Sequence, residues 1–441
     1  MELKLPAQVM EFIQKFSAAG FECFAVGGSV RDLLLGRQTE ESKRFDFATS
    51  AKPEEIQKLF PDSFYDNSFG TVGVKFADEI FEVTTYRKEG QYSDARHPDK
   101  VHWAKTIEED LKRREATISA IATDGKAIID PFDGQKDLKA KIFRAVGNPN
   151  DRYKEDALRM IRAIRISTQL GLVIEDETFQ AIQKNAAAIT KISTERIRDE
   201  LIKILSSDFP YDGIKLLHNA NLLSYILPEL TAGIGMKQPG HHISDVFVHS
   251  LDSLKFCKNR NWVVRFATLL HDIGKPPTLK ELNGKPTFYN HEVVGARIAR
   301  DICRHLHFKK EDIQKIFILV RWHMFSVSEL ITDAAVRRFI HRVGVENTED
   351  MLDLRIGDRL GSGSKASSWR LEDFKKRVVQ VQQHTPSVTD LEVNGHDVME
   401  VLRIPPGPQI CKILNKLFEE ITDDPSKNKR DYLLKRIKEL P

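Results

Sequence analysis

The stretch from Phe24 to Ala51 constrains the fold of this chain more than any other. It opens with an apolar run typical of a buried strand, breaks at Gly27-Gly28, and continues at once into a helix-like segment, Val30–Leu35. Two glycines let the backbone approach a ligand closely, and the free N–H groups at a helix N-terminus attract anions such as phosphates. The stretch therefore predicts a strand, a glycine turn and a helix, with a candidate phosphate site at the turn.

An acidic residue follows the helix in Phe45-Asp46-Phe47. The period-2 alternation of a strand places Asp46 on the face opposite the two phenylalanines. A carboxylate on a strand beside a phosphate-binding turn suits a divalent metal. Taken alone, an edge-strand surface residue is the more common role for Asp46.

The whole chain has the composition of an ordinary globular protein. Its 441 residues predict about three domains, and a formal charge of +3 does not by itself indicate nucleic-acid binding. The sequence contains no membrane-length apolar run and no signal-peptide core. The cysteines lack disulfide or metal spacing, which suits a reducing cytosol, and we predict a cytoplasmic protein. They are Cys23, Cys257, Cys303 and Cys411.

Together, GGSVRDLLLG and FDFATSA closely resemble the head of the tRNA nucleotidyltransferase and bacterial poly(A) polymerase family, within the polymerase β superfamily. The resemblance extends over essentially the whole chain. It implies that Gly27, Gly28, Arg31 and Asp32 bind the nucleotide. It also implies an α+β fold: a nucleotidyltransferase head (1–148), an all-helical neck (149–235), an HD domain (236–365) and a helical RNA-binding tail (366–441).

The chain departs from this family at a metal ligand. The family carries an Asp-x-Asp pair before Ala-Thr, whereas this sequence reads Arg44-Phe45-Asp46. An arginine in place of the first carboxylate opposes metal binding. Glu82, on a strand predicted to neighbour Asp46, is the candidate for an additional catalytic carboxylate, and a solvent-facing strand residue is an equally good reading. Asp46 remains the predicted Mg²⁺ ligand.

The segment RREATISA resembles the next family motif. Arg113 and Arg114 suit triphosphate or ribose contacts, because guanidinium groups pair bidentately with phosphate oxygens. The family's Asp and Asn are replaced here by Glu115 and Ser119. Between this motif and the predicted strands, residues 88–103 form a polar segment that we predict to be a loop.

Residues 152–171 approximate helical apolar spacing and contain Glu-Asp-x-x-Arg. In the family this helix replaces a nucleic-acid template: a carboxylate accepts from the amino group of C or A, and an arginine three residues on donates to ring acceptors. Here Asp156 and Arg159 hold these positions, and Arg162 follows as a further nucleotide-binding candidate. A surface salt bridge is the alternative.

A second chemical signal begins at FATLLHDIGKP. Adjacent His and Asp offer one imidazole nitrogen and one carboxylate oxygen to a metal. The order of His and Asp residues along this region resembles the HD phosphohydrolase superfamily, whose metal site hydrolyses phosphoesters, in relatives 2′,3′-cyclic phosphates of RNA ends. The predicted ligands of Mg²⁺, Mn²⁺ or a transition metal are His249, His271, Asp272, His291, His323 and Asp358.

The resemblance leads to one principal functional prediction, addition of C and/or A to a tRNA 3′ end from CTP and ATP. The alternative is a metal-dependent HD phosphohydrolase whose degenerate head serves as an RNA-binding module. A third reading has both sites silent and the protein clamping a structured RNA 3′ end. The sequence separates neither CCA from CC-only, A-only or poly(A) addition nor one oligomeric state from another.

Overall fold

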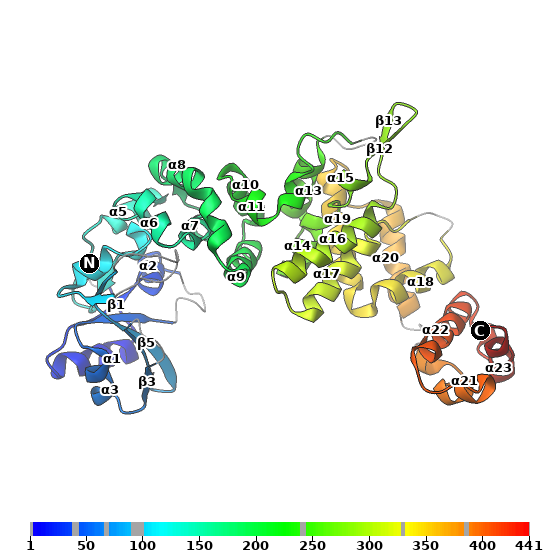
Figure 1. The fold of residues 1–441 in the computed structure, drawn as a ribbon, viewed down its shortest axis with the longest axis horizontal. Coiled ribbons are helices and arrows are strands. Elements are labelled where there is room, and N and C mark those ends of the chain that lie inside the picture. Colours follow the sequence, from blue (N-terminus) through cyan, green and yellow to red (C-terminus); the bar gives the residue numbers. More distant parts are fainter. Residues whose placement is uncertain are drawn as a thin grey trace. The chain divides into compact units, whose positions relative to one another are not determined.

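The structure is a computed structural model that describes residues 3–37, 44–65, 70–89, 101–238, 244–327, 331–382 and 388–440. The chain divides into two compact units, Met1–Pro228 and Glu229–Pro441 (Figure 1). The first unit holds a mixed β-sheet with helices, and the second is mostly helical. The predicted α+β class is confirmed.

The sheet of the first unit has seven strands in the order β3-β4-β5-β2-β1-β8-β9. Only β2 and β5 pair in parallel, and the other pairs in this sheet are antiparallel. The strands are β1 Cys23–Val26, β2 Asp46–Thr49, β3 Ser63–Tyr65, β4 Thr71–Phe76, β5 Glu79–Thr85, β8 Ala122–Thr123 and β9 Ile128–Ile129.

One face of this sheet is covered by the amphipathic helix α1 (Ala7–Ala18). The ring of Phe12 lies 4.7 Å from that of Phe47 on β2 and 4.9 Å from that of Phe81 on β5. Because successive side chains on a strand point to opposite faces, the neighbours Asp46 and Glu82 face away from α1. The predicted alternation at Asp46 is confirmed, since Phe47 is buried and Asp46 is exposed.

The glycine turn has the predicted form. Gly27 has φ of +78°, which favours glycine, and it connects β1 to helix α2 (Gly28–Leu34). The other helices of the head are α3 Pro53–Leu59, α4 Ile107–Leu111 and α5 Gly134–Ala140.

Two local predictions are corrected. The ends of the predicted loop 88–103 form an antiparallel pair, β6 (Arg87–Glu89) with β7 (Val101–Trp103), and residues 90–100 lie outside the described part of the chain. The predicted single helix 152–171 is two helices, α6 (Pro149–Glu155) and α7 (Leu158–Leu170). The helix breaks because Asp156 is extended and its carboxylate accepts a hydrogen bond from the Leu158 N–H at 2.9 Å.

The neck is mostly, not entirely, helical. β11 (Val173–Ile174) pairs in parallel with β10 (Ile142–Phe143) of the head, so this pair ties the two segments together. Helix α7 packs on α9 and α10. Besides α6 and α7, the neck contains α8 Asp176–Asn185, α9 Thr194–Leu205, α10 Pro210–Asn219, α11 Leu223–Ile226 and α12 Pro228–Thr231.

In the second unit, α13 and α19 pack closely because α19 presents two glycines to α13. A Cβ at Gly357 would lie 2.7 Å from the Ser253 carbonyl oxygen, and one at Gly361 would lie 2.6 Å from Ser253 Oγ. The helices here are α13 Val246–Phe256, α14 Trp262–Leu270, α15 Lys275–Thr278, α16 His291–His305, α17 Lys310–Trp322, α18 Asp333–Val343, α19 Thr348–Gly361 and α20 Trp369–Gln382.

A short hairpin and a terminal helical cluster complete this unit. The hairpin consists of β12 (Lys280–Leu282) and β13 (Lys285–Thr287). The terminal helices share their own apolar core. They are α21 Gly395–Leu402, α22 Pro408–Asp423 and α23 Arg430–Glu439. Among the described residues, no helix is long and apolar enough to cross a membrane.

Candidate nucleotide site and candidate metal centre

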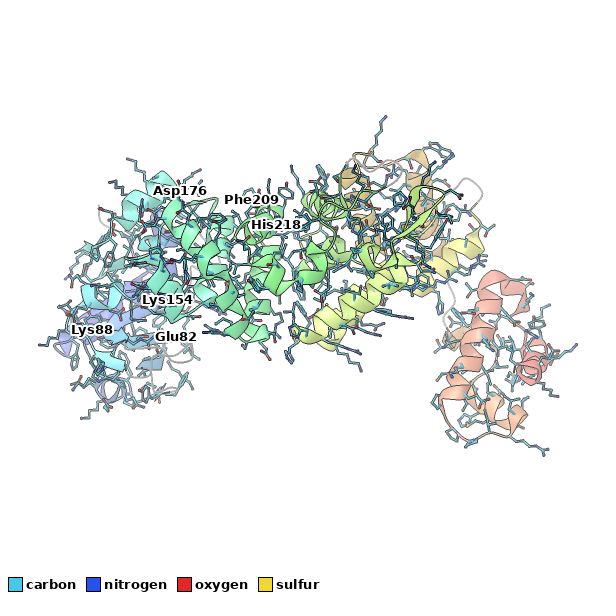
Figure 2. The ribbon with its side chains drawn as sticks, turned by 45° about the horizontal axis from the view of Figure 1, so that its top comes forward. Glu82, Lys88, Lys154, Asp176, Phe209 and His218 are labelled. Atoms are coloured by element: carbon cyan, nitrogen blue, oxygen red, sulfur yellow. The ribbon has the colours of Figure 1, made fainter. Side chains whose placement is uncertain are left out.

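The open face of the head sheet carries a cavity of ≈ 240 Å³. Asp46 and Glu82 are register partners on the parallel strands β2 and β5, and both predicted carboxylates line the same cavity. Figure 2 labels Glu82 within the head. Four arginines also line the cavity, and Arg44, which is exposed, is not among the lining residues. The polar lining residues are Asp46, Glu82, Thr84, Arg113, Arg114, Glu115, Ser119, Arg159 and Arg162.

The carboxylate of Asp46 is in an environment that calls for a cation. Although Asp46 keeps solvent access, desolvation by the surrounding protein raises its pKa, and the negative charge of Glu82 raises it further, whereas Arg114 and Arg162 lower it. Two neighbouring carboxylates that repel each other suit one shared divalent ion. Asp46 and Glu82 therefore fit a metal.

The glycine turn approaches arginines rather than open space. A Cβ at Gly27 would lie 3.1 Å from Arg114 Nη1, and one at Gly28 would lie 3.5 Å from Arg31 Nη2. Arg31 donates to the buried carboxylate of Asp32 at 2.9 Å. The four predicted nucleotide-binding residues of the turn, Gly27, Gly28, Arg31 and Asp32, do not line the cavity. Gly27 approaches Arg114, which does line it, so the turn borders the site.

Arg113 and Arg114 are held by a residue that the sequence reading missed. The buried Asp110 accepts from Arg113 Nε at 2.9 Å and from Arg114 Nη2 at 3.4 Å. Burial acts to raise the pKa of Asp110, but the two arginines lower it more, so its carboxylate stays charged. The spacing of Asp110 from Arg113 (i,i+3) and from Arg114 (i,i+4) was the sequence signal for these ion pairs.

Glu115 and Arg162, which both line the cavity, form an ion pair. The Arg162 guanidinium lies 2.8 Å from Glu115 Oε2 through Nε and 2.9 Å from Oε1 through Nη2. Burial acts to raise the pKa of Glu115, but Arg162, Arg165 and other arginines lower it below its usual range. Glu115 thus orients Arg162 and offsets part of the positive charge.

The two predicted base-reading residues have different surroundings. Arg159 lines the cavity and donates to Glu155 at 2.6 Å and to the Arg113 carbonyl at 3.2 Å. Asp156 is not among the lining residues, and its carboxylate accepts from Arg196 at 2.9 Å. Arg159 therefore lines the same cavity as Asp46 and Glu82, whereas Asp156 does not.

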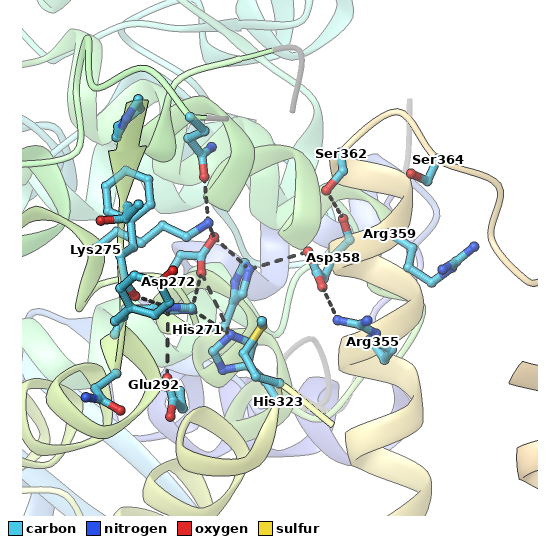
Figure 3. Close-up of a pocket in the computed structure, with 18 residues that line it drawn as sticks. His271, Asp272, Lys275, Glu292, His323, Arg355, Asp358, Arg359, Ser362 and Ser364 are labelled. Atoms are coloured by element: carbon cyan, nitrogen blue, oxygen red, sulfur yellow. Dashed lines mark hydrogen bonds and ion pairs between the residues drawn. The ribbon is translucent and has the colours of Figure 1, made fainter. Parts of the chain in front are cut away.

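In the second unit the six predicted metal ligands converge: His249 lies on α13, His271 and Asp272 follow α14, His291 begins α16, His323 follows α17 and Asp358 lies on α19. Figure 3 labels four of them, His271, Asp272, His323 and Asp358. Asp272 lies between them. Its Oδ2 is 3.4 Å from His249 Nε2 and 3.3 Å from His271 Nε2, and its Oδ1 is 3.3 Å from His291 Nε2. Two three-residue groups with metal-binding geometry share this carboxylate, His249–His271–Asp272 and Asp272–His291–His323.

The tautomers of three histidines prepare them for metal binding. The Nδ1 atoms of His271, His291 and His323 lie 2.7, 2.9 and 2.7 Å from backbone carbonyl oxygens, which only accept. Nδ1 therefore carries the hydrogen, and Nε2 presents its lone pair. The Nε2 atoms of His291 and His323 are 3.3 Å apart, so their lone pairs face each other unless a cation lies between them. These residues fit a divalent metal.

Charge in this centre favours cations. In the metal-free chain burial acts to lower the pKa of His271, but Asp272 and Asp358 raise it to about 10, so a metal that binds at Nε2 displaces a proton from this imidazole. Asp358 Oδ1 lies 3.2 Å from His249 Nε2, completing the set from α19. The sequence reading missed Lys275, whose Nζ lies 2.6 Å from Asp272 Oδ2.

Comparison with known proteins decides the family. The chain is 32% identical to the CCA-adding enzyme of Ligilactobacillus salivarius over 98% of its own length and 96% of that protein. The chain belongs to the CCA-adding enzyme family of tRNA nucleotidyltransferases. A CCA-adding enzyme of Lactococcus lactis is 31% identical over 99% of the chain and 98% of that protein.

The similarity also extends to a relative named for A-addition and to a solved structure of a CCA-adding enzyme. An A-adding tRNA nucleotidyltransferase of Deinococcus radiodurans is 35% identical over 71% of the chain and 75% of that protein. The crystal structure of the Bacillus stearothermophilus CCA-adding enzyme with CTP has a TM-score of 0.71 and 27% identity, covering 98% of this chain and 96% of that one.

Family models match three segments of the chain. They are the poly A polymerase head domain (residues 23–144), the "probable RNA and SrmB-binding site of polymerase A" (171–234) and the HD domain (246–360). The nucleotidyltransferase and HD families generally use divalent metals, in agreement with the candidate His/Asp groups of this chain.

Proposed function

We propose that this chain adds C and/or A to the 3′ end of tRNA, using CTP and ATP. The observation that carries the proposal is the head cavity, which Asp46 and Glu82 line together with four arginines, in a chain similar over 98% of its length to a CCA-adding enzyme. Carboxylates and guanidinium groups in one cavity suit a metal-bound triphosphate.

In this reaction the RNA 3′ hydroxyl attacks the α-phosphorus of the nucleotide. A new P–O bond forms, the bond to the β-phosphate oxygen breaks, pyrophosphate leaves, and the hydroxyl proton passes to a carboxylate or to water. Asp46 and Glu82 hold Mg²⁺, which when bound stabilises charge on the phosphate oxygens. Arg113 and Arg114, kept in place by Asp110, bind the triphosphate.

Base selection is assigned to Arg159, Arg162 and Asp156, with the glycine turn and Arg31–Asp32 bordering the nucleotide. Arg159 lines the cavity beside the carboxylates and is the donor to the base. Asp156 accepts from Arg196, so that contact sets the direction of its carboxylate. Arg196 is thus a positioning residue for Asp156.

Arg44 stands where the family carries its first metal-binding Asp, and we propose that it weakens Mg²⁺ binding without abolishing it. Arg44 is exposed and does not line the cavity, so its charge acts from the edge of the site. An Arg44→Asp variant is expected to lower the Mg²⁺ concentration for half-maximal extension by about tenfold or more. An unchanged Mg²⁺ dependence would refute this role.

The extension test uses purified full chain, Mg²⁺ and transcripts of one tRNA ending without CCA, with C, or with CC. Labelled CTP or ATP is supplied singly and together, and products are resolved at single-nucleotide length. Growth of all three ends to CCA identifies a CCA-adding enzyme, and growth of the CC end alone identifies A-addition. Absence of extension of every transcript would refute nucleotidyl transfer.

A second candidate function is supported by the convergence of six ligands around Asp272. We propose that the HD centre, from His249 to Asp358, hydrolyses phosphoesters, including 2′,3′-cyclic phosphates. Water attacks phosphorus, a P–O ester bond breaks, and the ribose oxygen takes a proton. The six His and Asp residues would hold Mg²⁺, Mn²⁺ or a transition metal, which would lower the pKa of the attacking water. Hydrolysis of bis(4-nitrophenyl) phosphate, lost in His271→Ala, tests it.

The remaining assignments concern organisation and surroundings. The head (1–148), neck (149–235), HD domain (236–365) and tail (366–441) are proposed as the domains, with the tail contacting the body of the tRNA. A reducing cytoplasm suits the free thiols, of which Cys23, Cys257 and Cys303 are buried.

A further inference from the structure

A second cavity of ≈ 590 Å³ lies beside the HD centre in the same unit. It is lined by residues of α16, α17, α18 and α20, and it shares Glu292 and Met324 with the ≈ 740 Å³ cavity that the metal ligands line. Figure 3 shows Glu292 beside the metal-binding side chains, with a dashed line joining it to the histidine it approaches. The two cavities therefore adjoin, and a ligand longer than one nucleotide spans both.

The rim of the second cavity is basic. The guanidinium of Arg321 lies 4.0 Å from the Trp322 ring centroid, and that of Arg342 lies 5.0 Å from it. A guanidinium stacked on an indole is held in position while its N–H edges stay available to an anion. Arg338 is the third arginine, whereas the only acidic lining residue among those described is Glu292, 3.7 Å from Arg321.

The floor is aromatic. Phe325 is half-buried, and its ring lies 4.7 Å from Phe339 and 5.3 Å from Phe374. Arg355, which lines the metal cavity, lies 5.6 Å from the Phe325 ring centroid, so this ring joins the two cavities. Aromatic rings beside stacked arginines are a platform for a base with its phosphate, and stacking accepts any base.

We propose that the second cavity binds the last-but-one nucleotide of an RNA 3′ end while the terminal nucleoside and its phosphate ester occupy the metal cavity. Its base stacks at Phe325, and the phosphate that joins it to the terminal nucleoside contacts Arg321 and Arg342. The HD centre is then selective for oligonucleotide ends over mononucleotides. The selectivity requires the proposed phosphohydrolase activity, whereas nucleotide binding in the second cavity does not require it.

The kinetic test compares two substrates with the Mn²⁺-loaded full chain: the dinucleotide ApA with a 2′,3′-cyclic phosphate, and 2′,3′-cyclic AMP. We expect kcat/KM to favour the dinucleotide by about tenfold or more, since a charged hydrogen bond and a stacked base are added. Arg342→Gln is expected to remove most of this preference, measured as the ratio of the two kcat/KM values. Arg304→Gln, an exposed arginine on α16 outside both cavities, is the matched control.

A binding test separates this inference from the phosphohydrolase. Calorimetric titration of metal-free full chain with ApA, which has no terminal phosphate, is expected to give about tenfold weaker binding for Arg342→Gln and Phe325→Leu than for wild type and Arg304→Gln. Equal affinity in all four proteins overturns the nucleotide site. Absence of bis(4-nitrophenyl) phosphate hydrolysis, with ApA binding still lost in Arg342→Gln, refutes the phosphohydrolase and supports the site.

Discussion

Gly274→Ala is predicted to disrupt the HD centre through packing alone. A Cβ at this position would lie 2.1 Å from the His291 carbonyl oxygen and 2.5 Å from the Gly295 nitrogen. Ordinary contact begins at 3.4 Å, so the start of α16 must move by about 1.3 Å. His291 Nε2 lies 3.3 Å from Asp272 Oδ1, and metal–ligand distances tolerate shifts of only about 0.2 Å. His291 is therefore lost as a ligand.

Overpacking of this kind costs about 1–3 kcal/mol, which lowers the melting temperature of a unit of this size by about 2–12 °C. Circular dichroism melts in chelator measure the packing effect, and elemental analysis of metal-loaded protein measures metal content, expected to fall. Gly407→Ala makes the same chemical change where the nearest atom is 4.0 Å away, and is the control. Wild-type melting and metal content in Gly274→Ala would refute the reasoning.

Three further predictions concern both units. Glu115→Gln leaves Arg162 without its carboxylate and lowers stability by about 1–3 kcal/mol. Because the folded pKa of Glu115 is lowered, the difference from wild type is full above about pH 5 and vanishes as pH falls through the folded pKa, as denaturant titrations will measure. Arg196→Ala is expected to raise the KM for CTP and ATP about tenfold with kcat kept, because Asp156 loses its orientation; an unchanged KM contradicts this. Chelator is expected to lower the melting temperature of wild type and not that of Asp272→Asn.

The parts of the fold predicted from sequence were those set by local rules. The β1–turn–α2 unit follows from an apolar run and two glycines, and the alternation around Asp46 follows from strand period. The HD ligands were predicted from their order along the chain, and the structure brings all six together.

The parts that sequence did not predict depend on tertiary contact or on competing local signals. Arg162 meets Glu115 from 47 positions away, a pairing that no local pattern encodes. The break at Asp156 carried a local signal, since Asp readily caps a helix, but apolar spacing across residues 152–171 favoured one helix. The second cavity assembles from four helices and had no linear motif.

We expect this chain to carry out two reactions in two separate centres, and variants with one centre removed distinguish them. Wild type, Asp46→Asn and His271→Ala are each assayed for extension of tRNA lacking CCA and for hydrolysis of bis(4-nitrophenyl) phosphate. We predict that wild type performs both reactions, that Asp46→Asn loses only extension, and that His271→Ala loses only hydrolysis. Wild-type protein that extends no tRNA in Mg²⁺ or Mn²⁺, or either variant losing both reactions while folded, would contradict the account.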